Sequence, residues 1–384
     1  MMCLRFAWAA LLVAGAVPAT AQIAVSSNDN KVLQVDGVNT VVRNPRPDTA
    51  TIIDLGVSPP RVIAELPAPG SWQAPPQSVA IAPDESIALV ANSTKIDPAD
   101  PAKTASDDVV SVIDLKATPP AVIATLHAGR GASGISINRA GTLALVANRA
   151  EGTLTVLAIR GRTVAVSGTV NLGDPNCGPS LPVFSPDGRR AFVTRNNDHK
   201  VSILSVSGMT VEYTKRDISA NLRPYGLEIS PKGDALYVAN IGNGPTGGAD
   251  TVGAIDLTVE PPRLADAITV GIVPEGIGLS PDGTMLAVNV MNGSNVPKAA
   301  PYFHDFGVLK ILRVQGTKLT PLAEAQVPGH WCEGVAWSRN QRTILVQCMV
   351  EHAIFVFGFD GRTPRVTGTI KVDGGAAGIR TADR

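Results

Sequence analysis

Residues 226–240 read GLEISPKGDALYVAN, two apolar stretches joined by the segment Ser230-Pro231-Lys232-Gly233. Proline presets φ for the second position of a tight turn, and the glycine supplies the positive φ that reverses the chain. This stretch therefore predicts a β-hairpin.

The same phrase recurs along the chain. Residues 276–289 read GIGLSPDGTMLAVN, residues 181–196 read LPVFSPDGRRAFVTRN, and looser copies begin at Ser78, Gly134, Gly334 and Gly378. Ser78 and Gly378 are 300 residues and six steps apart, so the mean repeat is 50 residues. A period in this range is typical of repeat folds, in which one unit alone cannot bury its hydrophobic face.

Two further runs of strand length follow each hairpin. After the copy at Ser78 they are SVIDL at 111–115 and VIATL at 122–126, and no helical period separates them. Runs rich in Val, Ile and Thr that are broken by Pro or Gly indicate strands. Each repeat is therefore predicted to be a four-stranded antiparallel sheet, whose strands we call a to d.

The seventh repeat is divided between the two ends of the chain. Its strand a begins near Gly378, and the N-terminal region supplies the other three as Ile23–Ser27, Thr51–Leu55 and Arg61–Leu66. A closing sheet shared by both ends removes the exposed edges that an open array of sheets would leave. The sequence thus predicts an all-β fold with 28 strands, a seven-bladed β-propeller whose closing blade is shared by the N- and C-termini.

Tyr237-Val238-Ala239-Asn240, after the turn at Ser230, resembles the Tyr-Val-Thr-Asn type of propeller repeat. That superfamily includes surface-layer-like proteins and lactonase-type seven-bladed propellers. The resemblance covers essentially the whole mature chain and implies the propeller fold. It allows a lactonase activity but assigns no catalytic position, because the matching residues lie in turns and strand ends that any such blade needs.

Residues 1–21 are predicted to be a secretory signal peptide. Arg5 precedes an apolar run over 7–17, and Ala19-Thr20-Ala21 precedes Gln22. The run is too short to span a bilayer, and its ending suits a signal peptidase. We expect cleavage after Ala21, a periplasmic or secreted protein without membrane insertion, and a single domain over residues 22–384.

The charge balance argues against a nucleic-acid partner. Removing residues 1–21 takes Arg5 with it, which leaves 32 Lys and Arg against 33 Asp and Glu. A net charge near zero gives no bulk attraction for polyanions. The chain also lacks a Cys-x-x-Cys-His haem sequence and a Gly-x-Ser-x-Gly elbow, so no cofactor is predicted. We also expect the protein to be a monomer.

Cys332 and Cys348 flank the predicted hairpin of the sixth repeat. If Trp337 faces Thr343 across that hairpin, the register places the two cysteines opposite each other, close enough for a disulfide in an oxidising compartment. The alternative is two buried free thiols. Cys177 is then the odd thiol, expected to be a small buried hydrophobic residue.

One face of the ring is predicted to carry the polar chemistry. Strand a lines the central channel of a propeller, so the residues that enter strand a should ring the channel mouth. These are Gln77, Ser133, Ser180, Tyr225, Glu275, Glu333 and Ala377. Four long b-to-c loops, at 29–49, 93–108, 241–250 and 290–307, should form walls on the same face. The alternative is that part of these loops, above all 97–108, is disordered.

Two carboxylates in that ring, Glu275 and Glu333, should repel each other, so that one has a raised pKa or binds a cation. Divalent-metal ligands could come from His304, His330 and His352, which lie in loops of the same face. Imidazole and carboxylate groups suit zinc, yet no tight His-x-x-x-His spacing occurs. The alternative is that these histidines are solvated loop residues.

Four arginines, Arg130, Arg149, Arg195 and Arg223, lie in or beside the loops of the predicted mouth. Guanidinium groups hold carboxylates and phosphates bidentately, so a small anionic ligand is expected, with rim salt bridges as the alternative.

Two functions follow. The first is a binding scaffold for a small anionic molecule or an envelope protein, in which Tyr225 and the mouth carboxylates complete the site. The second is a lactonase-like hydrolase acting on a small anionic lactone or sugar acid, in which Glu275 or Glu333, with His330, activates water.

Overall fold

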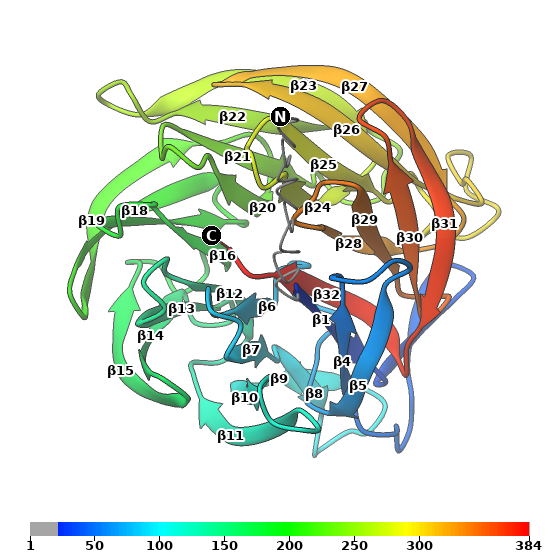
Figure 1. The fold of residues 1–384 in the computed structure, drawn as a ribbon, viewed down its shortest axis with the longest axis horizontal. Helices are drawn as coiled ribbons and strands as arrows, with labels where there is room; N and C mark the ends of the chain where they lie inside the picture. The colour runs from blue at the N-terminus through cyan, green and yellow to red at the C-terminus, as the bar shows by residue number, and fades with distance from the viewer. Residues whose placement is uncertain (1–21, 384) are drawn as a thin grey trace, which may run out of the picture.

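A computed structural model of the protein describes residues 22–383, and the predicted signal peptide lies outside these residues. The described chain is all β, and seven four-stranded antiparallel sheets stand in a ring around a central channel (Figure 1). The predicted seven-bladed β-propeller is therefore confirmed.

The strands follow one order, from the channel outward, in every blade. The closing blade contains β32 (Gly375–Thr381), β1 (Ile23–Asp29), β4 (Thr49–Asp54) and β5 (Arg61–Pro67); blade one contains β6 (Val79–Ile81), β7 (Ile87–Ala91), β10 (Val109–Asp114) and β11 (Ala121–His127). Blade two contains β12 (Ala132–Ile137), β13 (Leu143–Asn148), β14 (Thr153–Arg160) and β15 (Thr163–Asn171); blade three contains β16 (Pro179–Phe184), β17 (Arg190–Arg195), β18 (Lys200–Ser207) and β19 (Thr210–Ser219). Blade four contains β20 (Pro224–Ile229), β21 (Ala235–Asn240), β22 (Asp250–Asp256) and β23 (Arg263–Gly271); blade five contains β24 (Pro274–Leu279), β25 (Met285–Val290), β26 (Gly307–Gln315) and β27 (Lys318–Val327). Blade six contains β28 (Cys332–Trp337), β29 (Thr343–Cys348), β30 (Ala353–Phe359) and β31 (Pro364–Lys371).

The turn chemistry accounts for the repeated hairpins. Gly283 has φ +72°, and its backbone N–H donates to the carbonyl of Ser280 at 2.8 Å. Gly188 and Gly233 have φ +69° and +71° at the same place in their blades. The glycine of the repeated turn is thus needed for a left-handed conformation, as the sequence predicts.

The closing blade joins the two ends of the chain in one sheet. Strand β1 lies between β32 and β4, and Ala24 pairs with Thr381. The expected start of the last strand a, Gly378, is three residues late, because β32 begins at Gly375. Pairing between the ends leaves the ring without free strand edges at its junction.

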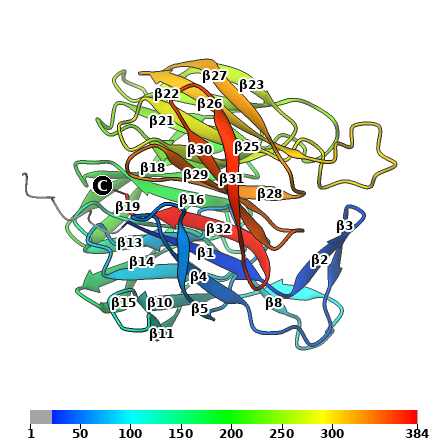
Figure 2. The same cartoon turned by 45° about the vertical axis from the view of Figure 1, so that its right-hand side comes forward.

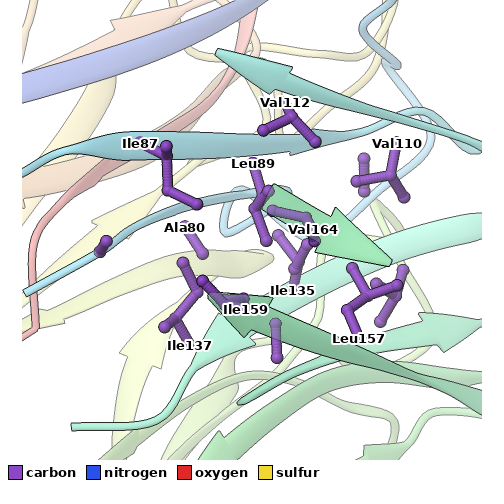
Figure 3. Packing of buried hydrophobic residues seen from close by; sticks show 14 of the residues in the cluster. Ala80, Ile87, Leu89, Val110, Val112, Ile135, Ile137, Leu157, Ile159 and Val164 are labelled. Carbon is purple, nitrogen blue, oxygen red and sulfur yellow. The ribbon is translucent and has the colours of Figure 1, made fainter. Parts of the chain in front are cut away.

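The hydrophobic core lies between neighbouring blades. Between blades one and two, Leu89, Ile135 and Val164 pack together (Figure 3), and Leu89 is fully buried. Burying one such side chain contributes about 1.5–3 kcal/mol, so the apolar faces of the sheets hold the ring together.

Two of the long b-to-c loops contain hairpins of their own. The closing blade carries β2 (Val32–Val35) and β3 (Val38–Val41), and blade one carries β8 (Thr94–Ile96) and β9 (Thr104–Ser106). The alternative of a disordered 97–108 segment is therefore wrong over Thr104–Ser106, which pair with β8.

A glycine that follows the mouth residue lets neighbouring blades approach. A Cβ added at Gly276 would lie 2.0 Å from the backbone oxygen of Glu333 in the next blade. We expect Gly276→Ala to destabilise the protein by about 3 kcal/mol or more, because the obstacle is backbone and cannot rotate away. Urea unfolding measures this cost. Gly168→Ala on β15 is the matched control, since nothing lies within 4 Å of a Cβ there; equal stability of the two variants would contradict the explanation.

Candidate functional site

A β-bulge near the start of strand a sets the mouth residues apart from the regular ladder. In blade six, Cys332 pairs with Cys348 and Val335 with Val346, so two residues between them have no partner in the register. Equivalent register shifts occur in β12, β16, β20 and β24. A bulge redirects a side chain out of the sheet, and in each of these blades the predicted mouth residue lies at it.

The same bulge corrects one sequence-based assumption. Trp337 faces Ile344 and not Thr343. The register shifts by one residue at the bulge, and this restores the opposition of Cys332 and Cys348. The structure joins these two cysteines in a disulfide.

The remaining cysteine is a separate, buried thiol. Cys177 is fully buried, and this burial raises the pKa of its thiol to about 11. It is therefore protonated and unreactive at neutral pH.

The channel narrows just inside the mouth. The side-chain amide of Gln77 in blade one donates to the carbonyl of Ile277 in blade five at 3.0 Å. These blades are not neighbours in the ring, so the bond crosses the channel. The mouth is thus a cup above this bond and not the entrance to a wide pore.

Two of the four predicted arginines reach the mouth. Arg149 donates to Ser180 Oγ at 2.5 Å and to Asn196 Oδ1 at 2.9 Å, and its guanidinium lies 5.4 Å from the ring centre of Tyr225. Arg223 donates to the same Asn196 oxygen at 3.3 Å. Both arginines are half-buried, so the pair is held in place and still open to solvent.

The other two arginines lie elsewhere. The Arg195 side chain is only 5% exposed, and it donates to the Leu172 carbonyl at 3.2 Å and to Asp198 at 3.1 Å. It therefore serves an internal ion-pair network and cannot meet a ligand at the mouth. Arg130 is exposed on the rim, 3.7 Å from Glu151, as the salt-bridge alternative describes.

The two mouth carboxylates are both shifted toward the neutral form. Burial raises the pKa of Glu275 to about 8, against the opposing effect of Arg149 and Arg223. Burial, and then the nearby Glu275, raise the pKa of Glu333 well above its usual range. Glu333 is 2% exposed and its Oε2 has no hydrogen-bond partner among the described residues. The pair therefore carries protons at neutral pH.

A buried ion cluster beside the mouth was missed by the sequence analysis. Lys31 Nζ lies 2.8 Å from Asp29 Oδ2, contacts Asp48, and donates to the carbonyl of Gly70 at 2.6 Å. Asp29 also contributes to the raised pKa of Glu333, so the cluster belongs to the electrostatics of the mouth. Its sequence signal is the polar run Asn28-Asp29-Asn30-Lys31, which ends β1 and begins the loop after it.

Two of the long loops meet above part of the mouth and form what we call the roof, made of β2–β3 and residues 291–306. The backbone N–H of Lys298 donates to Asp36 Oδ1 at 2.9 Å, and both segments project from the same face (Figure 2). Beneath them a buried apolar cluster includes Val32, Met291 and Trp331, and Trp331 stacks edge-on against Trp72 at 6.0 Å. Two of the four predicted walls are thus joined, and the apolar cluster beneath them includes Trp331 of blade six.

His330 is bound within blade six and the roof. Its Nδ1 lies 2.7 Å from Glu351 Oε1, its Nε2 lies 3.0 Å from Asp305 Oδ1, and its ring stacks on Phe303. Burial opposes protonation, but the hydrogen bonds to Glu351 and Asp305 outweigh it and raise the pKa of His330. Both ring nitrogens are therefore engaged, and among the described residues no hydrogen bond or ion pair joins His330 to Glu275 or to the Glu333 side chain.

The three candidate metal ligands are not brought together. His304 Nδ1 lies 2.9 Å from the carbonyl of Asn292, while burial lowers the pKa of His352, which contacts neither of the others. Within residues 22–383, no group of three His, Cys, Asp or Glu side chains is arranged to hold a metal ion. Over the same range, no helix has the length and apolar character needed to cross a membrane.

Solved structures with this fold cover nearly the whole chain. A Bacteroides fragilis protein named as a candidate 6-phosphogluconolactonase matches with a TM-score of 0.70 at 15% identity, covering 96% of this chain and 99% of its own. The Bacteroides uniformis protein of the same description gives 0.69 at 16% identity, covering 94% and 99%. The periplasmic gluconolactonase of Pseudomonas aeruginosa gives 0.65 at 17% identity, also covering 94% and 99%.

At these identities the likeness shows the fold alone. No family model matches the chain, and no curated protein matches its sequence. The resemblance to lactonase-like propellers is thus supported by architecture, while the Tyr-Val-Thr-Asn repeat itself has no support from a family model.

Proposed function

We propose that the protein binds a small anionic molecule at the channel mouth. The observation that carries this proposal is the convergence of Arg149 and Arg223 on Asn196 Oδ1, half-buried and beside Glu275. Two guanidinium groups fixed by neighbours offer paired donors to one carboxylate or phosphate.

The neighbouring groups favour an anion that also carries hydroxyls. Glu275 is protonated at neutral pH, because burial raises its pKa to about 8. A neutral carboxylic acid donates one hydrogen bond and accepts others, which suits a hydroxyl better than a second charge. Tyr225 supplies an aromatic wall against which Arg149 lies. A sugar acid has this combination of one carboxylate and several hydroxyls.

A second candidate function is hydrolysis of the corresponding lactone. The neighbouring carboxyls of Glu275 and Glu333 favour it, since one can act as base and the other as acid. Glu275 would act as the base once it ionises, above its pKa of about 8, and it would take a proton from the attacking water as the water oxygen bonds to the lactone carbonyl carbon. The ring C–O bond would then break, and the ring oxygen would take the proton of the other carboxyl, giving the hydroxy acid. His330 is left out of this scheme because Glu351 and Asp305 occupy both of its nitrogens.

A thermal-shift experiment tests the mouth as the binding site. We expect D-gluconate to raise the melting temperature of the parent protein, and the variant Arg149→Gln plus Arg223→Gln to lose most of this shift, because ligand binding to the folded state stabilises it by mass action. Arg130→Gln on the rim is the matched control and should retain the shift. A shift that survives in the double variant would refute the mouth as the binding site.

The same preparation tests turnover. Proton release from D-glucono-1,5-lactone above the buffer rate, lost in Glu275→Gln plus Glu333→Gln, would establish the hydrolase. Gluconate binding without proton release above the buffer rate would refute the hydrolase and support the binding function.

We propose further that the chain is exported and acts as a monomer, without a nucleic-acid partner and without a required metal. The Cys332–Cys348 disulfide supports an oxidising compartment. The intact mass of the protein recovered from the periplasm or the medium tests cleavage after Ala21.

A further inference from the structure

The loop at 196–199 of blade three, between β17 and β18, holds the mouth arginine Arg223 at two points. Asn196 Oδ1 accepts from Arg223 Nη2 at 3.3 Å, and His199 Nδ1 accepts from the backbone N–H of Arg223 at 3.1 Å. The first contact orients the guanidinium group, and the second holds the main chain from which it extends.

Arg223 needs a contact of the second kind because its backbone is left-handed. It has φ +57° and lies two residues before the mouth residue Tyr225. At the equivalent place, blades two and three have Gly131 and Gly178, with φ +72° and +62°. A residue with a Cβ is disfavoured in this region, whereas glycine adopts it freely. Blade four therefore has an arginine where the backbone favours glycine.

Blades five and six also have a side chain at this place, and they show how its backbone is held. Val273 and Trp331 have φ +53° and +46°. The N–H of Val273 donates to Asp250 Oδ2 at 3.0 Å, and that of Trp331 donates to Ser294 Oγ at 3.1 Å. The N–H of Gly131 donates to a backbone carbonyl instead, at 2.6 Å. In blades four to six, each residue that replaces the glycine thus has a side-chain acceptor for its N–H, and in blade four this acceptor is His199.

The imidazole of His199 can act in this way in only one form. A backbone N–H only donates, so Nδ1 must carry a lone pair and the ring proton must lie on Nε2 of a neutral ring. The backbone of His199 is itself anchored, because its carbonyl accepts from the N–H of Ala220 at 3.1 Å. Ala220 begins the segment that leads to Arg223, so the ring and its partner are fixed to each other.

The position of Arg223 matters because its charge is open to a ligand. Among the described residues, its guanidinium donates only to Asn196 Oδ1, and that of Arg149 donates to the same atom and to Ser180 Oγ. These acceptors are neutral, so neither positive charge is taken up by a carboxylate there. An anion gains from both charges only if the two guanidinium groups stay together.

We propose that His199 is a positioning residue of the anion site at the mouth. Its neutral imidazole keeps the main chain of Arg223 left-handed, and the guanidinium thereby stays on Asn196 beside Arg149. His199 acts through Arg223 and does not touch the ligand. This inference rests on the function proposed for the mouth.

Calorimetric titration with D-gluconate of two variants tests the proposal. His199→Gly removes the acceptor and suits the backbone, because His199 has φ +61° and Gly152, at the equivalent place in blade two, has φ +68°. We expect this variant to bind gluconate roughly threefold to tenfold more weakly, the scale of one hydrogen bond. His199→Asn places an amide oxygen near the position of Nδ1 and also tolerates the left-handed region, so its affinity should stay within about twofold of the parent's.

His352→Gly is the matched control. His352 lies at the equivalent place in blade six with φ +49°, and among the described residues no hydrogen bond joins its ring to Arg149 or Arg223. Its replacement should leave gluconate affinity unchanged. Parent-like affinity in His199→Gly, or the same loss in His199→Asn as in His199→Gly, would overturn the proposal.

A measurement without ligand separates this proposal from the function of the mouth. Nitrogen NMR of protein labelled in its histidine rings reports the tautomer, and the His199 signals are those missing from His199→Gly. We expect a bare Nδ1 and a protonated Nε2 in mildly alkaline solution. A proton on Nδ1 would overturn the proposal even if gluconate binds. A bare Nδ1 in a parent protein that does not bind gluconate would refute the proposed function and support the contact that positions Arg223.

Discussion

Deletion of residues 373–384 should abolish cooperative folding. The deletion removes β32, whose Ala376 and Ile379 are fully buried between blade six and the closing blade. It also leaves Glu228 buried without Arg380, and an unpaired buried charge costs about 3–5 kcal/mol. Circular dichroism during heating should show a broad transition or none.

The control is a shorter truncation. Deletion of Asp383 and Arg384 leaves β32 intact and, among the described residues, removes the ion pair of Arg380 with Asp383, whose side chain is 57% exposed. The melting temperature should therefore stay within about 2 °C of the parent. A cooperative, equally heat-resistant protein without 373–384 would refute closure of the ring by its two ends.

Replacement of both mouth carboxylates, Glu275→Gln plus Glu333→Gln, should stabilise the protein in alkaline solution. The folded-state pKa of Glu275 is raised to about 8 from an ordinary value of 4.5, and burial and the nearby Glu275 raise the pKa of Glu333 well above the same ordinary value. Between these values the folded state binds more protons than the unfolded state, so stability falls as the pH rises. The favourable contribution is complete below about pH 4.5 and is lost as the pH rises through the folded pKa.

We therefore expect the double variant to match the parent near pH 4.5 and to exceed it by roughly 3 kcal/mol at pH 9, after allowance for the partial exposure of Glu275. Urea unfolding across this pH range measures the difference. Glu212→Gln, at an exposed position of β19, is the matched control and should follow the parent. Parallel stability curves for parent and double variant would show that folding does not raise the pKa values of the two mouth carboxyls.

Much of the fold could be predicted because the information is local. Each turn such as Ser280-Pro281-Asp282-Gly283 specifies a hairpin by its own φ requirements, and the spacing of these turns specifies the number of blades. The shared closing blade followed from strand counting alone. The bulge after Cys332 could not be predicted in the same way, because the glycine that recurs in it, as at Gly276 and Gly334, does not by itself fix a shift of the strand register.

The site was less predictable, because side-chain direction depends on contacts distant in sequence. Arg149 and Arg195 both end a strand or begin the loop after it, yet one meets Asn196 at the mouth and the other turns to Asp198 and Leu172. Asp198, three residues after Arg195, is a local partner, whereas the partners of Arg149 come from the next blade and are distant in sequence. The roof was likewise hidden, since Asp36 and Lys298 meet only after the ring has closed.

The pairing of Ala24 with Thr381 has a consequence during synthesis. The ribosome makes β1 at the beginning and β32 at the end, so a nascent chain has no complete ring until its last residues emerge. Until then the edge of β1 that pairs with β32 has no partner, and the closing blade is incomplete. The last strand to be synthesised is therefore the one that seals the ring.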